Sequence, residues 1–131
     1  VDINPEVFPT AMEHYHIPED KCYTDIDKAF AENEADFAIV VVPPRHHEMV
    51  VDHALEHDMD ILSEKPVADT MEACVRIYKN VTQAGKKMAV TMRQRFDQDK
   101  QYLERGIKSG GHGKLNYLIG RNTWNCRKFA S

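Results

Sequence analysis

Three consecutive residues near the middle of the chain, Glu64-Lys65-Pro66, carry side chains suited to chemistry. They follow a short apolar segment, residues 60–63, that is typical of a buried strand running into a loop. In a parallel α/β sheet, ligands bind at the carboxyl ends of the strands. We expect a lysine there to be partly desolvated and available for proton transfer or for binding an oxyanion. The adjacent carboxylate can accept hydrogen bonds from the hydroxyl groups of a sugar.

The elements that must position this tripeptide alternate between strands and helices, which indicates a doubly wound α/β fold. The predicted strands are residues 21–24, 36–42, 60–63, 87–92 and 114–124. The predicted helices are residues 6–15, 25–33, 45–57, one that starts near Asp69 and ends before Gly85, and 97–108.

Two of these elements have distinctive patterns. Residues 36–42 form a β-branched run that stops at Pro43-Pro44, which is typical of a strand buried on both faces. In the helix that follows residue 68, Asp69 and Glu72 form a plausible capping box, and Gly85 supplies the C-terminal stop. The apolar stripe predicted for this helix consists of Met71, Cys74, Val75, Tyr78 and Val81.

Composition excludes several classes of protein. No apolar run approaches the length of a membrane span. The three cysteines are far apart and in no CxxC pairing, so we expect inert thiols in a reducing, cytoplasmic setting. The net charge of −4 is unevenly placed: residues 1–66 carry 4 basic and 16 acidic side chains, and residues 67–131 carry 13 basic and 5 acidic. A basic half could indicate nucleic acid, but its charges are scattered without interleaved aromatic residues, which favours solvated helix faces.

A second motif contains histidines that could bind a metal ion. Residues 53–57 read H-x-x-E-H, the inverted zincin motif, in which His53 and His57 would share one helix face. The apolar stripe of that helix leaves both histidines on the solvent side, so we expect no metal. Asp25 is expected to cap a helix, and Trp124 to pack in a sheet.

Several segments together resemble the Gfo/Idh/MocA family of NAD(P)-dependent oxidoreductases, which includes glucose-fructose oxidoreductase and inositol dehydrogenase. The similar segments occur in the family's order: residues 23–25 before a helix, Pro43 followed four residues later by His47, Glu64-Lys65-Pro66, residues 93–96, and the glycine turn at residues 110–115. The resemblance spans nearly the whole chain, and the ordered set is more specific than any of its members.

The resemblance implies roles for particular residues. Lys65 would be catalytic, close to the nicotinamide and the reacting carbinol, and Glu64 would contact the cofactor. Pro43 and His47 would line the dinucleotide crevice, and Asp2 would accept hydrogen bonds from the adenosine ribose. Arg93 and Arg95 would face the substrate or the cofactor. An acid at Asp2 favours NAD over NADP, because a 2′-phosphate would meet a negative charge.

The departures from the family pattern suggest an internal fragment. No Gly-rich phosphate loop precedes Asp2, and the family's downstream Asp/His pair would lie beyond Ser131. We therefore expect residues 1–96 to be a truncated Rossmann-type dinucleotide-binding domain without its first strand. Residues 97–131 would be a connecting helix and the first strand of a C-terminal α+β domain for substrate binding and oligomerisation. The strand 36–42 would then expose one edge, and this chain alone should not catalyse hydride transfer.

Two functions from different classes follow. The first is part of an NAD(P)-dependent oxidoreductase that acts on a sugar, polyol or similar hydroxylated molecule, with a homo-oligomer as the intact form. The alternative is a non-catalytic, ligand-sensing or scaffold protein built on the same fold. The downstream Asp/His pair would discriminate between them.

Overall fold

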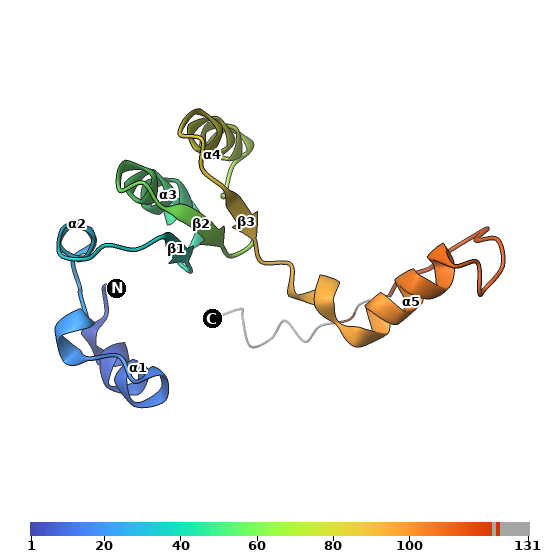
Figure 1. Cartoon of the computed structure of the whole chain (residues 1–131), viewed down its shortest axis with the longest axis horizontal. Helices are drawn as coiled ribbons and strands as arrows, with labels where there is room; N and C mark the ends of the chain where they lie inside the picture. The colour runs from blue at the N-terminus through green and yellow to red at the C-terminus, as the bar shows by residue number, and fades with distance from the viewer. Residues whose placement is uncertain (122, 124–131) are drawn as a thin grey trace. The chain divides into compact units, whose positions relative to one another are not determined.

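The computed structural model describes residues 1–121 and 123 of the 131-residue chain. The chain divides into two compact units, residues 1–91 and residues 92–131. The first holds η1 (Pro5–Val7), α1 (Phe8–Tyr15), η2 (Glu19–Lys21), α2 (Ile26–Ala31), β1 (Phe37–Val40), η3 (Pro44–His46), α3 (His47–Glu56), β2 (Asp60–Ser63), α4 (Met71–Gln83) and β3 (Met88–Val90) (Figure 1). The second holds η4 (Arg93–Phe96) and α5 (Gln98–Lys108).

A parallel sheet of order β1-β2-β3 organises the first unit. Val40 pairs with Ser63, and Ser63 pairs with Val90, so the three strands end at the same edge. Parallel neighbours need a crossover, and α3 and α4 are the two crossover helices. This arrangement is the parallel α/β sheet that the alternating pattern predicts.

Helices α3 and α4 cover one face of the sheet and form the core with it (Figure 1). Val40 of β1, Val51 of α3 and Ile77 of α4 are the largest apolar side chains that are fully buried there. The core is completed by Ala54, Met59, Ile61, Ala68, Ala73 and Val81. Burial of an aliphatic side chain of this size contributes about 1.5–3 kcal/mol, so this layer holds the sheet and its loops in place.

The inward face of α4 differs from the predicted stripe. Of the predicted stripe, Val81 is buried and Cys74 packs against the core, whereas Met71, Val75 and Tyr78 are exposed. Ala73 and Ile77 are the other buried residues of the helix. The cap differs as well, because the Thr70 hydroxyl, in place of Asp69, accepts the hydrogen bond from the Ala73 N–H at 3.2 Å. The small Ala73 side chain lets the helix approach the core closely. A stripe chosen from the larger apolar side chains leaves Ala73 out and so predicts a different rotation of the helix about its axis. Gly85, with φ +66°, follows the helix as predicted.

The opposite face of β1 is not buried, which corrects the prediction of a strand buried on both faces. Phe37 and Ile39 are 55% and 63% exposed, and Val41, just past the end of the strand, is 68% exposed. β1 is also an edge strand of the sheet in the described residues, as the sequence predicted for a sheet without its first strand. An exposed apolar edge of this kind favours pairing with further chain.

Two predicted strands are not found. Residues 21–24 form no strand. They make one backbone hydrogen bond of the kind found between strands, from the Asp2 N–H to the Tyr23 carbonyl at 3.0 Å. Residues 114–121 and 123 also lie outside any strand, and Trp124 and Cys126 lie outside the described residues. A strand is stabilised by its ladder partners, and neither segment has a neighbouring strand in the described part of the chain.

Cys22 and Cys74 are free thiols, and both are half-buried. Within residues 1–121 and 123, every helix is too short or too polar to cross a lipid bilayer.

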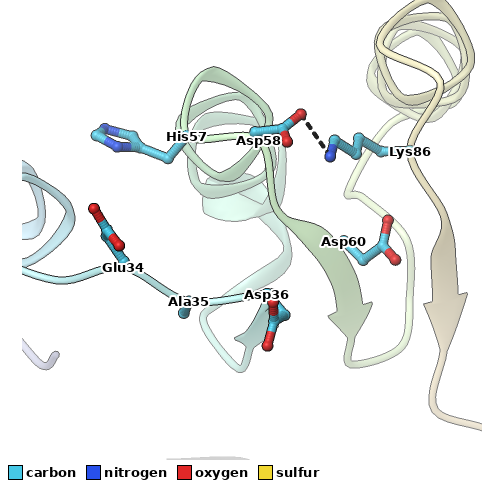
Figure 2. Close-up of a pocket in the computed structure, with 7 residues that line it drawn as sticks. All are labelled: Glu34, Ala35, Asp36, His57, Asp58, Asp60 and Lys86. Atoms are coloured by element: carbon cyan, nitrogen blue, oxygen red, sulfur yellow. Dashed lines mark ion pairs between the residues drawn. The ribbon is translucent and has the colours of Figure 1, made fainter.

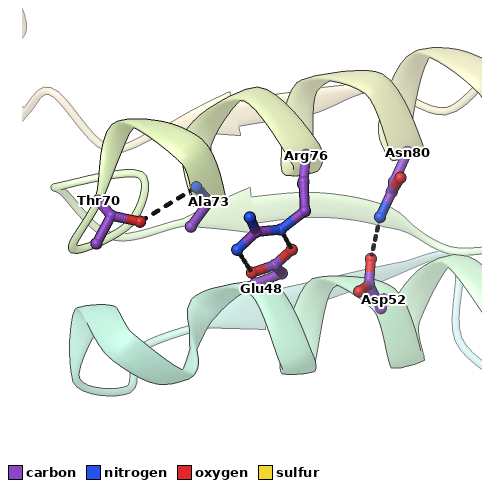
Figure 3. Close-up of polar contacts among 6 residues, drawn as sticks. All are labelled: Glu48, Asp52, Thr70, Ala73, Arg76 and Asn80. Atoms are coloured by element: carbon purple, nitrogen blue, oxygen red, sulfur yellow. Dashed lines mark hydrogen bonds and ion pairs between the residues drawn. The ribbon is translucent and has the colours of Figure 1, made fainter.

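Polar contacts fix the two crossover helices against each other on their outer side (Figure 3). The Arg76 guanidinium of α4 donates two hydrogen bonds to the Glu48 carboxylate of α3, one of them from Nη2 to Oε2 at 2.8 Å. The Asn80 side chain donates to Asp52 at 2.8 Å one turn further along. Arg76 holds the pKa of the Glu48 carboxyl below its usual value through these hydrogen bonds.

The Glu48–Arg76 pair makes stability depend on pH. Because the folded-state pKa of Glu48 is lowered, its contribution is present above the usual carboxyl value of about 4.3 and is lost as pH falls through the lower folded value. We expect Arg76→Gln to lower the Tm at pH 7 by a small amount, since the pair is exposed, and the difference to vanish at acid pH. Lys79→Gln, which removes a charge on the same helix with no ion pair in the described residues, is the control for thermal unfolding. A deficit that persists unchanged below pH 3 would contradict this assignment.

Candidate functional site

The carboxyl edge of the sheet brings together Pro43, Glu64 and Lys65, three of the predicted site residues of the first unit. The Glu64 N–H donates to the Val40 carbonyl at 2.9 Å, and the Thr91 N–H donates to the Ser63 carbonyl at 2.8 Å. The strand register therefore continues one residue past β2 and β3, which places Glu64 between the ends of β1 and β3. Glu64 and Lys65 follow β2 directly, as the sequence predicted, and Pro43 lies shortly after the end of the neighbouring strand β1.

The electrostatics of this edge centre on Glu64. Two donors lower the pKa of its carboxyl: first the nearby Thr91 hydroxyl and then the Lys65 backbone N–H. Only the N–H makes a well-formed hydrogen bond, at 3.0 Å to Oε2, because Thr91 Oγ1 has no partner with suitable geometry among the described residues. The ionised Glu64 carboxylate keeps acceptor capacity for a ligand hydroxyl or amide.

Thr91 was not among the residues predicted from the sequence. Its hydroxyl oxygen is buried and unpartnered in the described residues, at the end of β3. A count of strand-end residues on all three strands would have found it, since it follows Val90 as Glu64 follows Ser63. An orphaned buried hydroxyl beside a carboxylate marks a polar site, because such atoms are rarely left unpaired.

Lys65 differs from expectation in one respect. Its side chain is exposed, and it makes no ion pair in the described part of the chain, so it is not partly desolvated in this structure. The reason is local: Lys65 lies one residue beyond the strand ladder, and no element of the first unit covers it. Its exposed ammonium is available to a ligand at the sheet edge.

Pro43 and His47 lie on either side of η3 at the end of β1. The Pro43 carbonyl accepts from the His46 N–H at 2.8 Å, and the proline ring is exposed. His47, the first residue of α3, is fully buried. Its ring nitrogens lie 2.8 Å from the Val42 carbonyl and 3.1 Å from the Val67 carbonyl. His47 therefore lies beneath the surface of the edge that it was predicted to line.

The remaining predicted residues lie elsewhere. Asp2 is exposed, and its Oδ1 accepts from the Asn4 N–H at 2.8 Å, which leaves acceptor capacity on the carboxylate. Arg93 and Arg95 belong to η4 in the second unit, where both are exposed. Arg95 lines a small pocket of that unit with Phe96, Gln101, Glu104, Arg105 and Lys108.

A larger pocket opens at the opposite, amino-terminal edge of the sheet (Figure 2). Asp36 and Asp60 stand at the starts of β1 and β2, and Lys86 forms an ion pair with Asp58. The other lining residues are Glu34, Ala35 and His57. Four carboxylates against one lysine disfavour a ligand with phosphate groups. The candidate functional site is therefore the carboxyl edge of the sheet and not this pocket.

The H-x-x-E-H histidines contact helix α2. His53 Nε2 lies 3.2 Å from the Asp27 carboxylate, and the His57 ring stacks on Phe30 with ring centroids 5.0 Å apart. No group of three potential ligating side chains gathers within residues 1–121 and 123.

The fold and the polar carboxyl edge define a class of protein, and comparison with known families names it. Residues 1–92 match the Gfo/Idh/MocA oxidoreductase family, whose fold is the NAD-binding Rossmann fold. The match covers most of the chain, so the chain belongs to this family. The NAD-binding Rossmann fold predicted from the sequence is confirmed.

Among the relatives, the protein y4oX of Sinorhizobium fredii is 41% identical over all of this chain and 36% of its own length. Inositol 2-dehydrogenase of Corynebacterium glutamicum is 31% identical over 90% of this chain and 35% of its own length. The chain thus spans about a third of the length of the curated relatives it matches.

Solved structures show the same fold. Scyllo-inositol dehydrogenase from Lactobacillus casei, with bound NAD(H) and scyllo-inositol, gives a TM-score of 0.75 at 22% identity and covers 86% of this chain and 33% of its own. The WlbA dehydrogenase from Chromobacterium violaceum, in complex with NADH and UDP-GlcNAcA, gives a TM-score of 0.73 at 23% identity, over 86% of this chain and 32% of its own.

The residues at the carboxyl edge carry groups that can hydrogen bond a dinucleotide. The unpartnered Thr91 hydroxyl, the ionised Glu64 and the exposed Lys65 supply a donor, an acceptor and a cation within one strip of the sheet edge. A dinucleotide carries amide and hydroxyl groups that need both donors and acceptors. Nothing in this strip conflicts with such a ligand.

Proposed function

We propose that the full-length protein is an NAD-dependent oxidoreductase that transfers hydride between nicotinamide and a carbinol carbon of an inositol or a related polyol or sugar. The observation that carries the proposal is the placement of Glu64 and Lys65 at the carboxyl edge of a parallel sheet in a chain of this family. The substrate class follows from the inositol dehydrogenases among its relatives.

The chain's own residues would bind and orient the reactants. Lys65 Nζ would hydrogen bond the substrate hydroxyl and assist the departure of its proton, since its ammonium is exposed and outside any ion pair in the described residues. Glu64 would accept a hydrogen bond from the cofactor, and Pro43 would form the wall beside it. The nicotinamide, when bound, supplies the hydride acceptor.

Three further roles complete the proposal. Asp2 would accept hydrogen bonds from the adenosine ribose, and its negative charge favours NAD over NADP. Arg93 and Arg95 would contact the substrate. The protein is expected to be a homo-oligomer in the cytoplasm. Sedimentation analysis would measure its oligomeric state.

The test is reduction of NAD and NADP, followed by absorbance, with myo-inositol, scyllo-inositol and a panel of sugars and polyols. We expect turnover with at least one inositol or related polyol and a higher kcat/KM with NAD. A protein that binds NAD in calorimetry but turns over none of the panel would favour the alternative, a ligand-sensing protein on the same fold. A protein that binds neither dinucleotide would overturn both.

A further inference from the structure

His47 connects three segments of backbone at the carboxyl edge of the sheet. Its Nε2 lies 2.8 Å from the carbonyl of Val42, the residue before Pro43 at the end of β1. Its Nδ1 lies 3.1 Å from the carbonyl of Val67 and 3.4 Å from the hydroxyl of Ser63. Ser63 and Val67 are the residues that flank Glu64-Lys65-Pro66 on its two sides.

The two side chains that make these contacts are buried, so the contacts are shielded from water. His47 and Ser63 are both fully buried, and they are the polar side chains of the described residues that reach this state. The Ser63 hydroxyl in turn donates to the Glu64 carbonyl at 3.1 Å. The imidazole holds the loop when Nδ1 carries a proton and donates to the Val67 carbonyl; a neutral ring then has no second N–H for the Val42 carbonyl. A carbonyl that loses its donor costs about 1–3 kcal/mol, so this contact favours the observed arrangement of the loop.

The loop has few other polar contacts in the described residues. The backbone of Glu64 is held by the Val40 carbonyl, and the Lys65 N–H by the Glu64 side chain, while Lys65 and Pro66 are exposed. Beyond Glu64, the chain returns to the core through the packing of Val67 and Ala68 and through the contact between the Val67 carbonyl and His47, which is the polar part of that return.

From this geometry we infer that His47 is a positioning residue: it ties the Glu64-Lys65-Pro66 loop to the end of β1 and so sets where the Lys65 backbone stands relative to the Pro43 wall. The inference rests on the proposed function for its catalytic consequence. It also differs from direct cofactor binding, because a fully buried ring offers no surface to a ligand. A displacement of about 1 Å in a catalytic group can lower the rate about 10²-fold, so the contact is expected to affect kcat.

The experiment compares His47→Phe, which keeps a ring but removes both nitrogens, with wild type in the full-length protein. His57→Phe, the same substitution just beyond the other end of α3, is the matched control, because stacking on Phe30 remains possible there. We expect His47→Phe to lower kcat by about 10-fold to 100-fold and to change the dissociation constant for NAD by less than about 3-fold. In a Lys65→Met background the same substitution should have almost no further effect on kcat, because its consequence passes through Lys65.

Hydrogen exchange supplies a readout that does not depend on turnover. Residues 63–68 should exchange faster in His47→Phe than in wild type, and β3 should not. If wild type shows no turnover but the exchange difference is present, the positioning role holds and the proposed function fails. Wild-type exchange in residues 63–68 together with unchanged kcat would overturn the positioning role, and so would a loss confined to NAD affinity.

A second variant covers the case in which His47→Phe does not fold. His47→Gln keeps an amide donor within reach of one carbonyl, so we expect faster exchange confined to residues 63–68 and a smaller loss of kcat. Exchange and kcat equal to wild type in this variant would overturn the inference on their own.

Discussion

Lys65→Met is expected to lower kcat of the full-length protein by about 10²-fold to 10⁴-fold, the usual contribution of a side chain that transfers or holds a proton. Methionine is close to lysine in length but has neither charge nor donor, so the loop around it should keep its conformation. The exposed position of Lys65 supports this, because the substitution removes no ion pair in the described residues. Steady-state kinetics with the best polyol of the panel, together with calorimetry of NAD binding, are the measurements.

The control for Lys65 is Lys79→Met, which makes the same change on the exposed side of α4. It should leave kcat, KM and NAD affinity at wild-type values. If Lys65→Met retained wild-type turnover, Lys65 would not be the proton-handling group, and the carboxyl edge of the sheet would have to act through another residue.

Ile77→Ala is expected to destabilise the protein by about 2–5 kcal/mol, the usual cost of removing a large aliphatic side chain from a closed core. Ile77 is 1% exposed and lies in the cluster that joins α4 to β1, α3 and β2. Its truncation leaves a cavity between the helix layer and the sheet, because the surrounding backbone is held by the strand ladders. Urea unfolding followed by circular dichroism measures the loss.

Tyr78→Ala is the informative control, because Tyr78 was assigned to the apolar stripe from the sequence and is 71% exposed in the structure. Its substitution should change the free energy of unfolding by less than about 0.5 kcal/mol. A larger loss for Tyr78→Ala than for Ile77→Ala would show that α4 is rotated relative to this structure.

The sequence predicted the strand-helix alternation well wherever local signals were strong. Strand β2 has the predicted bounds, residues 60–63, because Glu64-Lys65-Pro66 follows it immediately and ends the apolar run. Asp25 caps α2 as predicted, with its carboxylate accepting from the Lys28 N–H at 3.1 Å. The collinear segments also identified the family that comparison confirmed.

Prediction was weaker where a partner in space decides the outcome. Residues 21–24 and 114–121 have strand-like composition but form no strand, since a strand requires a neighbouring ladder. In α4, whether Tyr78 or Ile77 faces the core depends on the rotation of the helix about its axis relative to α3. The hydrogen bonds from Arg76 to Glu48 and from Asn80 to Asp52 fix that rotation.

The sequence by itself determined the order of elements, the family and the presence of Glu64 and Lys65 at a strand end, because strand and helix periods and their Pro and Gly boundaries are local properties of the chain. Only the tertiary structure decided that His47 lies buried between the Val42 and Val67 carbonyls and that Thr91 stands beside Glu64. Both follow from strand register and helix placement, which bring together residues that are more than twenty positions apart in some cases. A hydrogen bond between such residues is set by the fold, and no local pattern in the chain records it.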